Sequence, residues 1–408
     1  MIAHRVRPLL AAALLALAGC SGDGGIDGPG TGTAGTTSAP TVTAPASTSA
    51  AAPTTTTASA QHLLPGMPAP LSATDVYAAT RELDPTVLGH LPRVYVPNSE
   101  SHTITVIDPA TFRVVDSYPS GGIEPQHVVP SYDLQTLYAN NDLPIGGGSL
   151  LPIDPRTGEP GTPIPVRDPY NMYFTPDGRY ALVVAEADRS LDFYDPHTWQ
   201  LSHAIAVPDC GGVNHMDFTA DGRTALVSCE FSGRMAVVDI AGMRLVRMID
   251  LPQGRSGKPQ DVKLSPDGRT FYVADMIANG IYVFDAATFE NTAFVPTGHG
   301  AHGLYVTRDS RAMLITNRHA GSISVWDFAA GGLVRTWQLP GGGSPDMGNL
   351  SADGRVFWVS GRHHGEVYAI DVVEWKLLAR IPVGRGAHGL TVWPQPGRYS
   401  TGHTGVMR

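Results

Sequence analysis

The chain has 408 residues, of which 42% are hydrophobic and 16% are charged, and its formal net charge at pH 7 is −9. This composition excludes a disordered polyelectrolyte and is rich enough in apolar residues for a large folded core. The acidic balance argues against a nucleic-acid-binding protein, which needs a basic surface, so we expect no nucleic-acid partner.

The first 19 residues are expected to be a lipoprotein signal peptide. Arg5 and Arg7 form a basic start, and the apolar run at 9–18 is too short to span a bilayer. The run ends in the letters LAGC, which resemble the bacterial lipobox and imply cleavage before Cys20 and lipid attachment to its sulfur. The alternative is an ordinary secretory signal with a stray cysteine. In both cases the protein leaves the cytoplasm.

Residues 20–60 are expected to be the lipidated Cys20 followed by a disordered tether. They consist almost entirely of Gly, Ser, Thr, Ala and Pro, which cannot bury apolar surface. Such a tether would hold the folded part at the outer face of a membrane in the cell envelope. The sequence leaves open a periplasmic or an extracellular location, and an inner or an outer membrane.

Residues 61–92 form a lead-in to the repeated part of the chain. Ser72 followed by Asp75 resembles a capping box, which predicts a short helix over residues 76–83. We expect this helix to pack on the domain that follows.

Residues 93–397 repeat a unit of about four short strands. An Asp that ends an apolar strand recurs at intervals of 41 to 46 residues, at Asp108, Asp154, Asp195, Asp239, Asp285, Asp327 and Asp371. Asp-Gly turns recur between strands, as tight hairpins favour, because Gly accepts positive φ. This spacing is typical of propeller blades, whereas a helical array would show a 3.6-residue apolar period.

The ends of the repeated region predict how many blades there are. Six complete repeats start near His127, Asn171, His215, Asp261, His302 and Asp346. Three strands at 93–118 precede them, and a single innermost strand at 388–393 follows. We expect the two fragments to combine into one split blade. The sequence therefore predicts an all-β, seven-bladed β-propeller over 93–397 that is closed by its own ends, with a tail at 398–408.

Several strands carry a family resemblance. The segments RVYVPN at 93–98, TITVID at 103–108 and FYVAD at 271–275 resemble the YVTN-repeat, YncE-like propeller family. The resemblance covers about residues 93–397 and implies the fold, but not a function, because that family includes surface, binding and enzymatic members. The placement of histidines is more loosely similar to the propellers of cytochrome-cd-one type nitrite reductases and of haem maturation. The chain has no Cys-x-x-Cys-His, so no c-type haem is expected.

A candidate ligand-binding site is expected at one mouth of the central channel. There the starts of the innermost strands meet the hairpins between the second and third strands of each blade. The innermost strands contribute His127, Asn171, His215, Asp261, His302, Asp346 and His388. The hairpins add Arg189, Arg318, His319, Arg362 and His363, with Glu186, Glu230, Asp275 and His364 nearby. Imidazoles bind metal or haem, and guanidiniums bind carboxylate or phosphate. The alternative is that these groups only line a wet channel.

Cys210 and Cys229 are expected on the same face. An oxidising compartment favours a disulfide between them. A soft metal site that includes His215, or two free buried thiols, stays open as an alternative.

Three functional hypotheses follow. In the first, a membrane-tethered, extracytoplasmic propeller binds an anionic small molecule, a metal chelate or a protein partner at the His-rich mouth. The anionic ligand could be a carboxylated tetrapyrrole or an acidic glycan. In the second, the same mouth belongs to a haem- or metal-dependent oxidoreductase or lyase. In the third, the protein is a structural or adhesion module. A haem-type tetrapyrrole or a divalent metal stays open as the cofactor, no catalytic or metal-binding residue is assigned, and we expect a monomer.

Overall fold

The computed structural model describes residues 62–143, 147–403 and 406–408. The predicted signal peptide, the predicted lipidation at Cys20 and the predicted tether lie outside these residues. Within the described part, no helix is long and apolar enough to cross a membrane.

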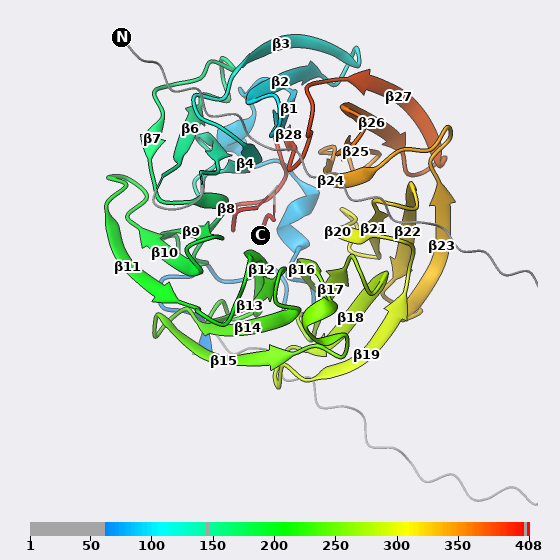
Figure 1. Cartoon of the computed structure of the whole chain (residues 1–408). Helices are drawn as coiled ribbons and strands as arrows, with labels where there is room; N and C mark the ends of the chain where they lie inside the picture. The colour runs from blue at the N-terminus through cyan, green and yellow to red at the C-terminus, as the bar shows by residue number, and fades with distance from the viewer. Residues whose placement is uncertain (1–61, 144–146, 404–405) are drawn as a thin grey trace, which may run out of the picture. The chain divides into compact units, whose positions relative to one another are not determined.

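The described residues form seven four-stranded antiparallel sheets around a central axis (Figure 1). The predicted all-β, seven-bladed propeller is confirmed. The innermost strands are β4 (Pro125–Pro130), β8 (Pro169–Phe174), β12 (Val213–Phe218), β16 (Pro259–Leu264), β20 (Ala301–Val306), β24 (Pro345–Leu350) and β28 (Thr391–Trp393). The second strands are β1 (Arg93–Asn98), β5 (Leu137–Asn141), β9 (Ala181–Ala185), β13 (Thr224–Cys229), β17 (Thr270–Asp275), β21 (Ala312–Asn317) and β25 (Val356–Gly361).

The outer half of each blade completes the sheet. The third strands are β2 (Thr103–Asp108), β6 (Ser149–Ile153), β10 (Ser190–Tyr194), β14 (Arg234–Asp239), β18 (Gly280–Asp285), β22 (Ser322–Asp327) and β26 (Glu366–Asp371). The outermost strands are β3 (Arg113–Pro119), β7 (Ile164–Pro165), β11 (Leu201–Ala206), β15 (Arg244–Asp250), β19 (Asn291–Pro296), β23 (Gly332–Gln338) and β27 (Lys376–Pro382).

One sheet combines strands from the two ends of the repeated region. Its order is β28-β1-β2-β3, and β28 pairs antiparallel with β1 so that Trp393 faces Arg93. The other six sheets each consist of four consecutive strands.

Burial falls from the axis to the rim. Every residue of β16 is buried, whereas all residues of β3 except Tyr118 are exposed. The core lies between blades: Val184 and Leu191 of one blade pack in one cluster with Val213 and Val227 of the next. Apolar side chains on both faces of the inner strands are therefore covered by neighbouring blades, as a propeller requires.

The lead-in differs from the expected helix. Ser72 and Asp75 do not cap a helix over 76–83; instead a four-residue 3-10 helix, η2 (Ala78–Arg81), forms without a side-chain cap. Tyr77 is the reason, because its side chain enters the channel and its hydroxyl donates to the carbonyl oxygen of Leu264 at 2.8 Å. A continuous α-helix would compete with that tertiary contact. Two further 3-10 helices in the described part are η3 (Pro85–Val87) and η4 (Gly254–Ser256).

One end of the channel is covered by the lead-in and by the tail. The backbone N–H of Leu64 donates to the oxygen of Asp221, and that of Val76 donates to the oxygen of Pro266. Both acceptors lie in turns between first and second strands, so the lead-in lies on that face. The end of the chain pairs with β8 through Thr401 and His403. Figure 1 shows η2 in blue and the chain end in red near the centre of the ring. The hairpins that carry the candidate mouth lie on the opposite face.

Candidate functional site

All seven predicted residues of the innermost strands are buried at the axis. None of these residues is more than 2% exposed. The exposed fraction is 2% for His388, 1% for His302, and 0% for His127, Asn171, His215, Asp261 and Asp346. The structure divides them into two groups. One is built around Asp346, and the other is built around Asn171 and two histidines.

Asp346 is the centre of a buried ion-pair network. Its carboxylate accepts from Nδ1 of His388 at 2.7 Å and from Nε of Arg318 at 2.7 Å, and it lies 3.2 Å from Nδ1 of His302. Arg318 also donates to Nε2 of His302. Burial alone would raise the pKa of Asp346, but Arg318, His302 and Arg362 bring it below the ordinary value. Asp346 therefore stays ionised, and the hydrogen bonds and charges of Arg318 and the histidines compensate its negative charge within the protein.

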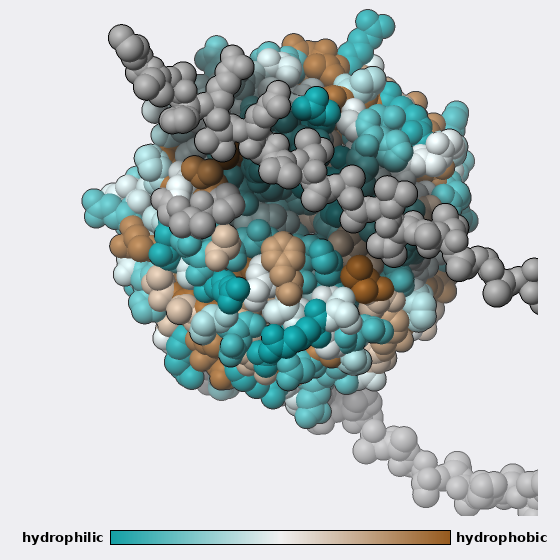
Figure 2. Space-filling model, viewed as in Figure 1, coloured by the Kyte–Doolittle hydropathy of each residue, from teal (hydrophilic) through white to brown (hydrophobic). Residues whose placement is uncertain are grey.

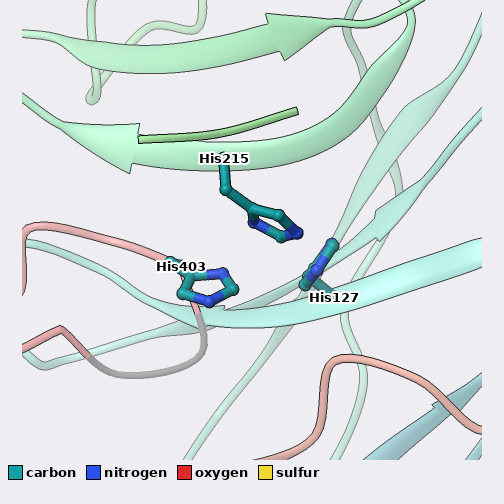
Figure 3. A group of neighbouring side chains, drawn as sticks. All are labelled: His127, His215 and His403. Atoms are coloured by element: carbon teal, nitrogen blue, oxygen red, sulfur yellow. The ribbon is translucent and has the colours of Figure 1, made fainter. Parts of the chain in front are cut away.

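The second group joins His127 and His215 to His403 of the tail. Figure 3 shows the three imidazoles pointing toward one another. One ring nitrogen from each lies within 4.8 Å of the others. The amide nitrogen of Asn171 donates to Nδ1 of His215 at 3.0 Å and to Nδ1 of His403 at 3.1 Å. The ring centroids of His215 and His403 are 4.7 Å apart.

Burial keeps these imidazoles neutral. It lowers the pKa of His127 to about 3, with the neighbouring His403 as the next cause. Burial is also the largest cause that lowers the pKa of His215, His388 and His403 well below 6.5. Neutral imidazoles have a free lone pair, which is the form that binds metal ions.

Tyr170 and Gly389 hold His127 in place. Nδ1 of His127 lies 3.0 Å from the carbonyl oxygen of Tyr170, so this nitrogen donates and Nε2 keeps its lone pair. The hydroxyl of Tyr170 lies 3.4 Å from Nε2 of His388. A Cβ atom at Gly389 would lie 2.1 Å from Cδ2 of His127, so only glycine leaves room for the ring.

Arg318 belongs to the buried network, whereas the other predicted hairpin residues lie outside the group of buried histidines. Arg362 is partly buried, and its Nη1 atom is buried with no hydrogen-bond partner among the described residues. The rings of His319 and His363, both exposed, stack with centroids 6.4 Å apart. Burial and then Arg318 lower the pKa of both imidazoles below 6.5. Arg189 lies elsewhere on this face, where it donates to the carbonyl oxygen of Pro208 at 3.0 Å.

Carboxyl groups gather on another part of the mouth. Burial raises the pKa of Glu186 to about 9, and Glu230 adds to the shift. Burial and the neighbouring Asp168 raise the pKa of Asp142 to about 8. Glu186 and Asp142 are therefore mostly protonated at neutral pH. Glu186 also lines a cleft of about 410 Å³, together with Arg189, Asp209, Phe231 and Arg255 among others.

Two of the predicted site residues also accept hydrogen bonds from the backbone, and Asp261 joins two blades in this way. The carboxylate of Asp261 accepts from the backbone of Val262 and, in the next blade, from that of Leu304 at 2.8 Å. Asn171 accepts from the backbone of Met172 through its oxygen. Cys210 and Cys229 form a disulfide, so neither thiol is free to bind metal with His215.

Sequence reasoning did not include His403 or Tyr170 in the site. From the sequence, His403 could lie against the channel or fray with the tail; no signal selects the first interpretation, so His403 is not among the predicted site residues. Tyr170 precedes Asn171 at the start of an innermost strand, so position within the repeat was the one signal that pointed to it.

The comparisons with known proteins support the fold. The model of a family described as YNCE-like beta-propeller matches residues 253–396. A comparison with curated proteins finds no match. A functionally unknown protein from Desulfotomaculum acetoxidans is 16% identical, with a TM-score of 0.61 over 74% of this chain and 98% of that chain.

Two similar solved structures come from proteins with named activities. Hydrazine synthase of Kuenenia stuttgartiensis is 21% identical, with a TM-score of 0.53 over 64% of this chain and 87% of that chain. The dihydro-heme d1 dehydrogenase NirN, solved in complex with DHE, is 16% identical, with a TM-score of 0.53 over 81% of each chain. At these identities the likeness extends to the fold alone. The chain is thus a seven-bladed β-propeller, and over residues 253–396 it is similar to the YNCE-like propeller family.

Proposed function

We propose that the protein is a membrane-tethered, extracytoplasmic propeller that binds an anionic small molecule at the mouth of its channel. The observation that carries this proposal is the buried, unpartnered Nη1 atom of Arg362. Burying a guanidinium N–H without an acceptor is costly, and a carboxylate or phosphate oxygen would remove the cost.

The charges around Arg362 favour an anion on this part of the mouth. Arg318 is a second cation there, and its Nε atom already donates a hydrogen bond to the carboxylate of Asp346 at 2.7 Å. The carboxyl groups that would repel an anion, Glu186 and Asp142, have raised pKa values of about 9 and about 8 and carry little charge at pH 7. The ionised carboxylate of Asp346 is also near Arg362, but it is paired with Arg318, so the net charge that opposes a ligand oxygen at Nη1 of Arg362 is small.

The surroundings of the mouth fit a small polar ligand. The same face also has the cleft of about 410 Å³ lined by Arg189, a separate place of a size that small molecules occupy, and the test below distinguishes the two. The surface visible in Figure 2 is mostly hydrophilic, with scattered hydrophobic residues. Since NirN was solved in complex with DHE, a carboxylated tetrapyrrole is the first ligand to test.

The test is binding of haemin, citrate and phosphate to the full-length chain by calorimetry. We expect at least one of the three to bind and Arg362→Gln to weaken it by at least about 10-fold, since a charge-assisted hydrogen bond is lost. Arg189→Gln is the matched control, because Arg189 is also a hairpin arginine on this face but donates to a protein carbonyl.

Two results would overturn the proposal. One is the absence of binding for all three probes at millimolar concentration. The other is that Arg189→Gln weakens binding and Arg362→Gln does not. This result would show that the ligand binds in the cleft lined by Arg189.

A further inference from the structure

We propose that His127, His215 and His403 bind one divalent transition-metal ion at the axis of the propeller. This site is independent of the anion at Arg362. It uses two histidines from innermost strands, β4 and β12, and one from the tail (Figure 3).

The three histidines come from distant parts of the chain and converge from different directions. Their candidate ligand atoms lie within 4.8 Å of one another. An ion with metal–nitrogen bonds of about 2.0–2.1 Å needs these atoms roughly 1 Å closer. The backbone of His403 is hydrogen-bonded to Met172 of β8, so a turn of its side chain, and not a shift of the tail, would bring its ring nitrogen closer to the other two.

Three buried ring nitrogens in this cluster lack hydrogen bonds. The Nε2 atoms of His127, His215 and His403 have no hydrogen-bond partner among the described residues. Buried polar atoms without partners are rare because each one costs free energy. A cation bound through these Nε2 atoms would give each of the three nitrogens a partner.

The opposite nitrogens of the rings have the contacts that orient metal ligands. The carbonyl oxygen of Tyr170 accepts from Nδ1 of His127, which leaves the Nε2 lone pair for an ion. The amide of Asn171 bridges Nδ1 of His215 and His403. Binding through Nε2 puts the protons of these two rings on Nδ1, so the amide turns its oxygen toward them and gives up its bond to Met172.

The surroundings supply one carboxylate, one ammonium group (Lys263) and room for one more ligand. The carboxylate of Asp261, which is fully buried, lies 3.6 Å from Nε2 of His403. A cavity of about 40 Å³ reaches His403 between Tyr77, Lys263 and Tyr305, and this volume is enough for a water molecule. Three imidazoles with a carboxylate or water suit Zn²⁺, Co²⁺, Ni²⁺ or Cu²⁺ rather than Ca²⁺ or Mg²⁺.

The test is metal binding to the full-length chain after treatment with a chelator. We expect one Zn²⁺ per chain by calorimetry, and a Co²⁺ absorption spectrum typical of a site with nitrogen ligands. His403→Gln should weaken Zn²⁺ binding by more than about 100-fold, beyond the 10–100-fold typical of residues that only orient ligands. This variant alters the tail alone, so the blades should still fold, and circular dichroism will verify that.

Two further variants sharpen the test. His299→Gln removes an exposed histidine outside the cluster and should leave the stoichiometry and affinity unchanged. Asn171→Asp places a carboxylate where the Nδ1 protons of His215 and His403 need acceptors, so it should tighten Zn²⁺ binding by about 10-fold.

The proposal fails if the chain binds no Zn²⁺ or Co²⁺ at millimolar concentration. It also fails if His403→Gln, shown to be folded, binds Zn²⁺ as the parent does. Because the readout is metal content and spectrum, a negative result for the anion at Arg362 would not affect it.

Discussion

At the scale of the residue, burial determines the protonation state of most titratable side chains in the channel. Burial lowers the pKa of His127 to about 3 and raises that of Glu186 to about 9. Asp346 is the exception, because Arg318, His302 and Arg362 offset the effect of its burial on the pKa. At neutral pH the axis therefore holds neutral imidazoles, one ionised carboxylate network and a protonated Glu186 at the mouth.

Glu186 should make the stability of the protein depend on pH. In the unfolded chain its pKa is near 4.5, whereas in the folded protein it is about 9. The folded state thus holds the proton more tightly, so its contribution to stability is full below about pH 4.5 and is lost as the pH rises to about 9. Glu186→Gln should remove this loss and raise the melting temperature relative to the parent at pH 9, with less change at pH 5.

The measurement is thermal unfolding of both proteins at pH 5, 7 and 9. Glu374→Gln, at an exposed glutamate, is the control and should follow the parent at each pH. Identical pH profiles for the parent and Glu186→Gln would contradict the assignment.

At the scale of the element, polar side chains of neighbouring innermost strands meet at the axis of the channel. His127 of β4 and His215 of β12 meet there because the blades repeat the same geometry. The loop before β12 forms part of the cleft through Gly211 and Gly212, and the disulfide of Cys210 and Cys229 ties this loop to β13. A disulfide therefore fixes one wall of the cleft.

Removing this disulfide should lower the free energy of unfolding. It links cysteines that are 19 residues apart, and closing a loop of that size contributes about 3 kcal/mol. The double change Cys210→Ala with Cys229→Ala should cost about this amount in denaturant unfolding. The parent under reducing conditions should lose a similar amount, and an unchanged midpoint in both experiments would be inconsistent with this role.

At the scale of the whole molecule, the two ends of the described chain close one end of the channel. Arg408 donates to the carboxylate of Asp217 at 2.8 Å, and its guanidinium lies 4.5 Å from the centroid of the Tyr77 ring. Both charged groups are buried, with 8% of Arg408 and 1% of Asp217 exposed. The last residue and the lead-in thus meet on the innermost strand of a blade.

Arg408→Ala should destabilise the protein by about 3 kcal/mol, because it leaves Asp217 as a buried charge without its cation. The measurement is the free energy of unfolding in denaturant. Arg311→Ala is the control: Arg311 pairs with Asp309 at 3.9 Å, and both side chains are mostly exposed. This control should change stability by less than about 0.5 kcal/mol. Equal effects of the two changes would show that the buried pair contributes little.

Local patterns in the sequence were enough to determine the architecture. The recurring Asp and the Asp-Gly turns lie within single repeats, so they predict strand boundaries, blade number and fold class without any distant contact. They also place His127, His215, His302 and His388 at matching positions. Short-range rules failed in the lead-in, where the contact of Tyr77 with Leu264 replaces the expected helix.

Only the tertiary structure decided how the polar residues divide their roles. Asp346 pairs with Arg318, His302 and His388, whereas His127 and His215 face His403. The path of the tail brings His403 to the axis, and no periodic pattern encodes that path because it depends on contacts with β8. The sequence by itself thus determined the ring of blades and the positions of its histidines. The folded chain determined which of their ring nitrogens lack a hydrogen-bond partner among the described residues.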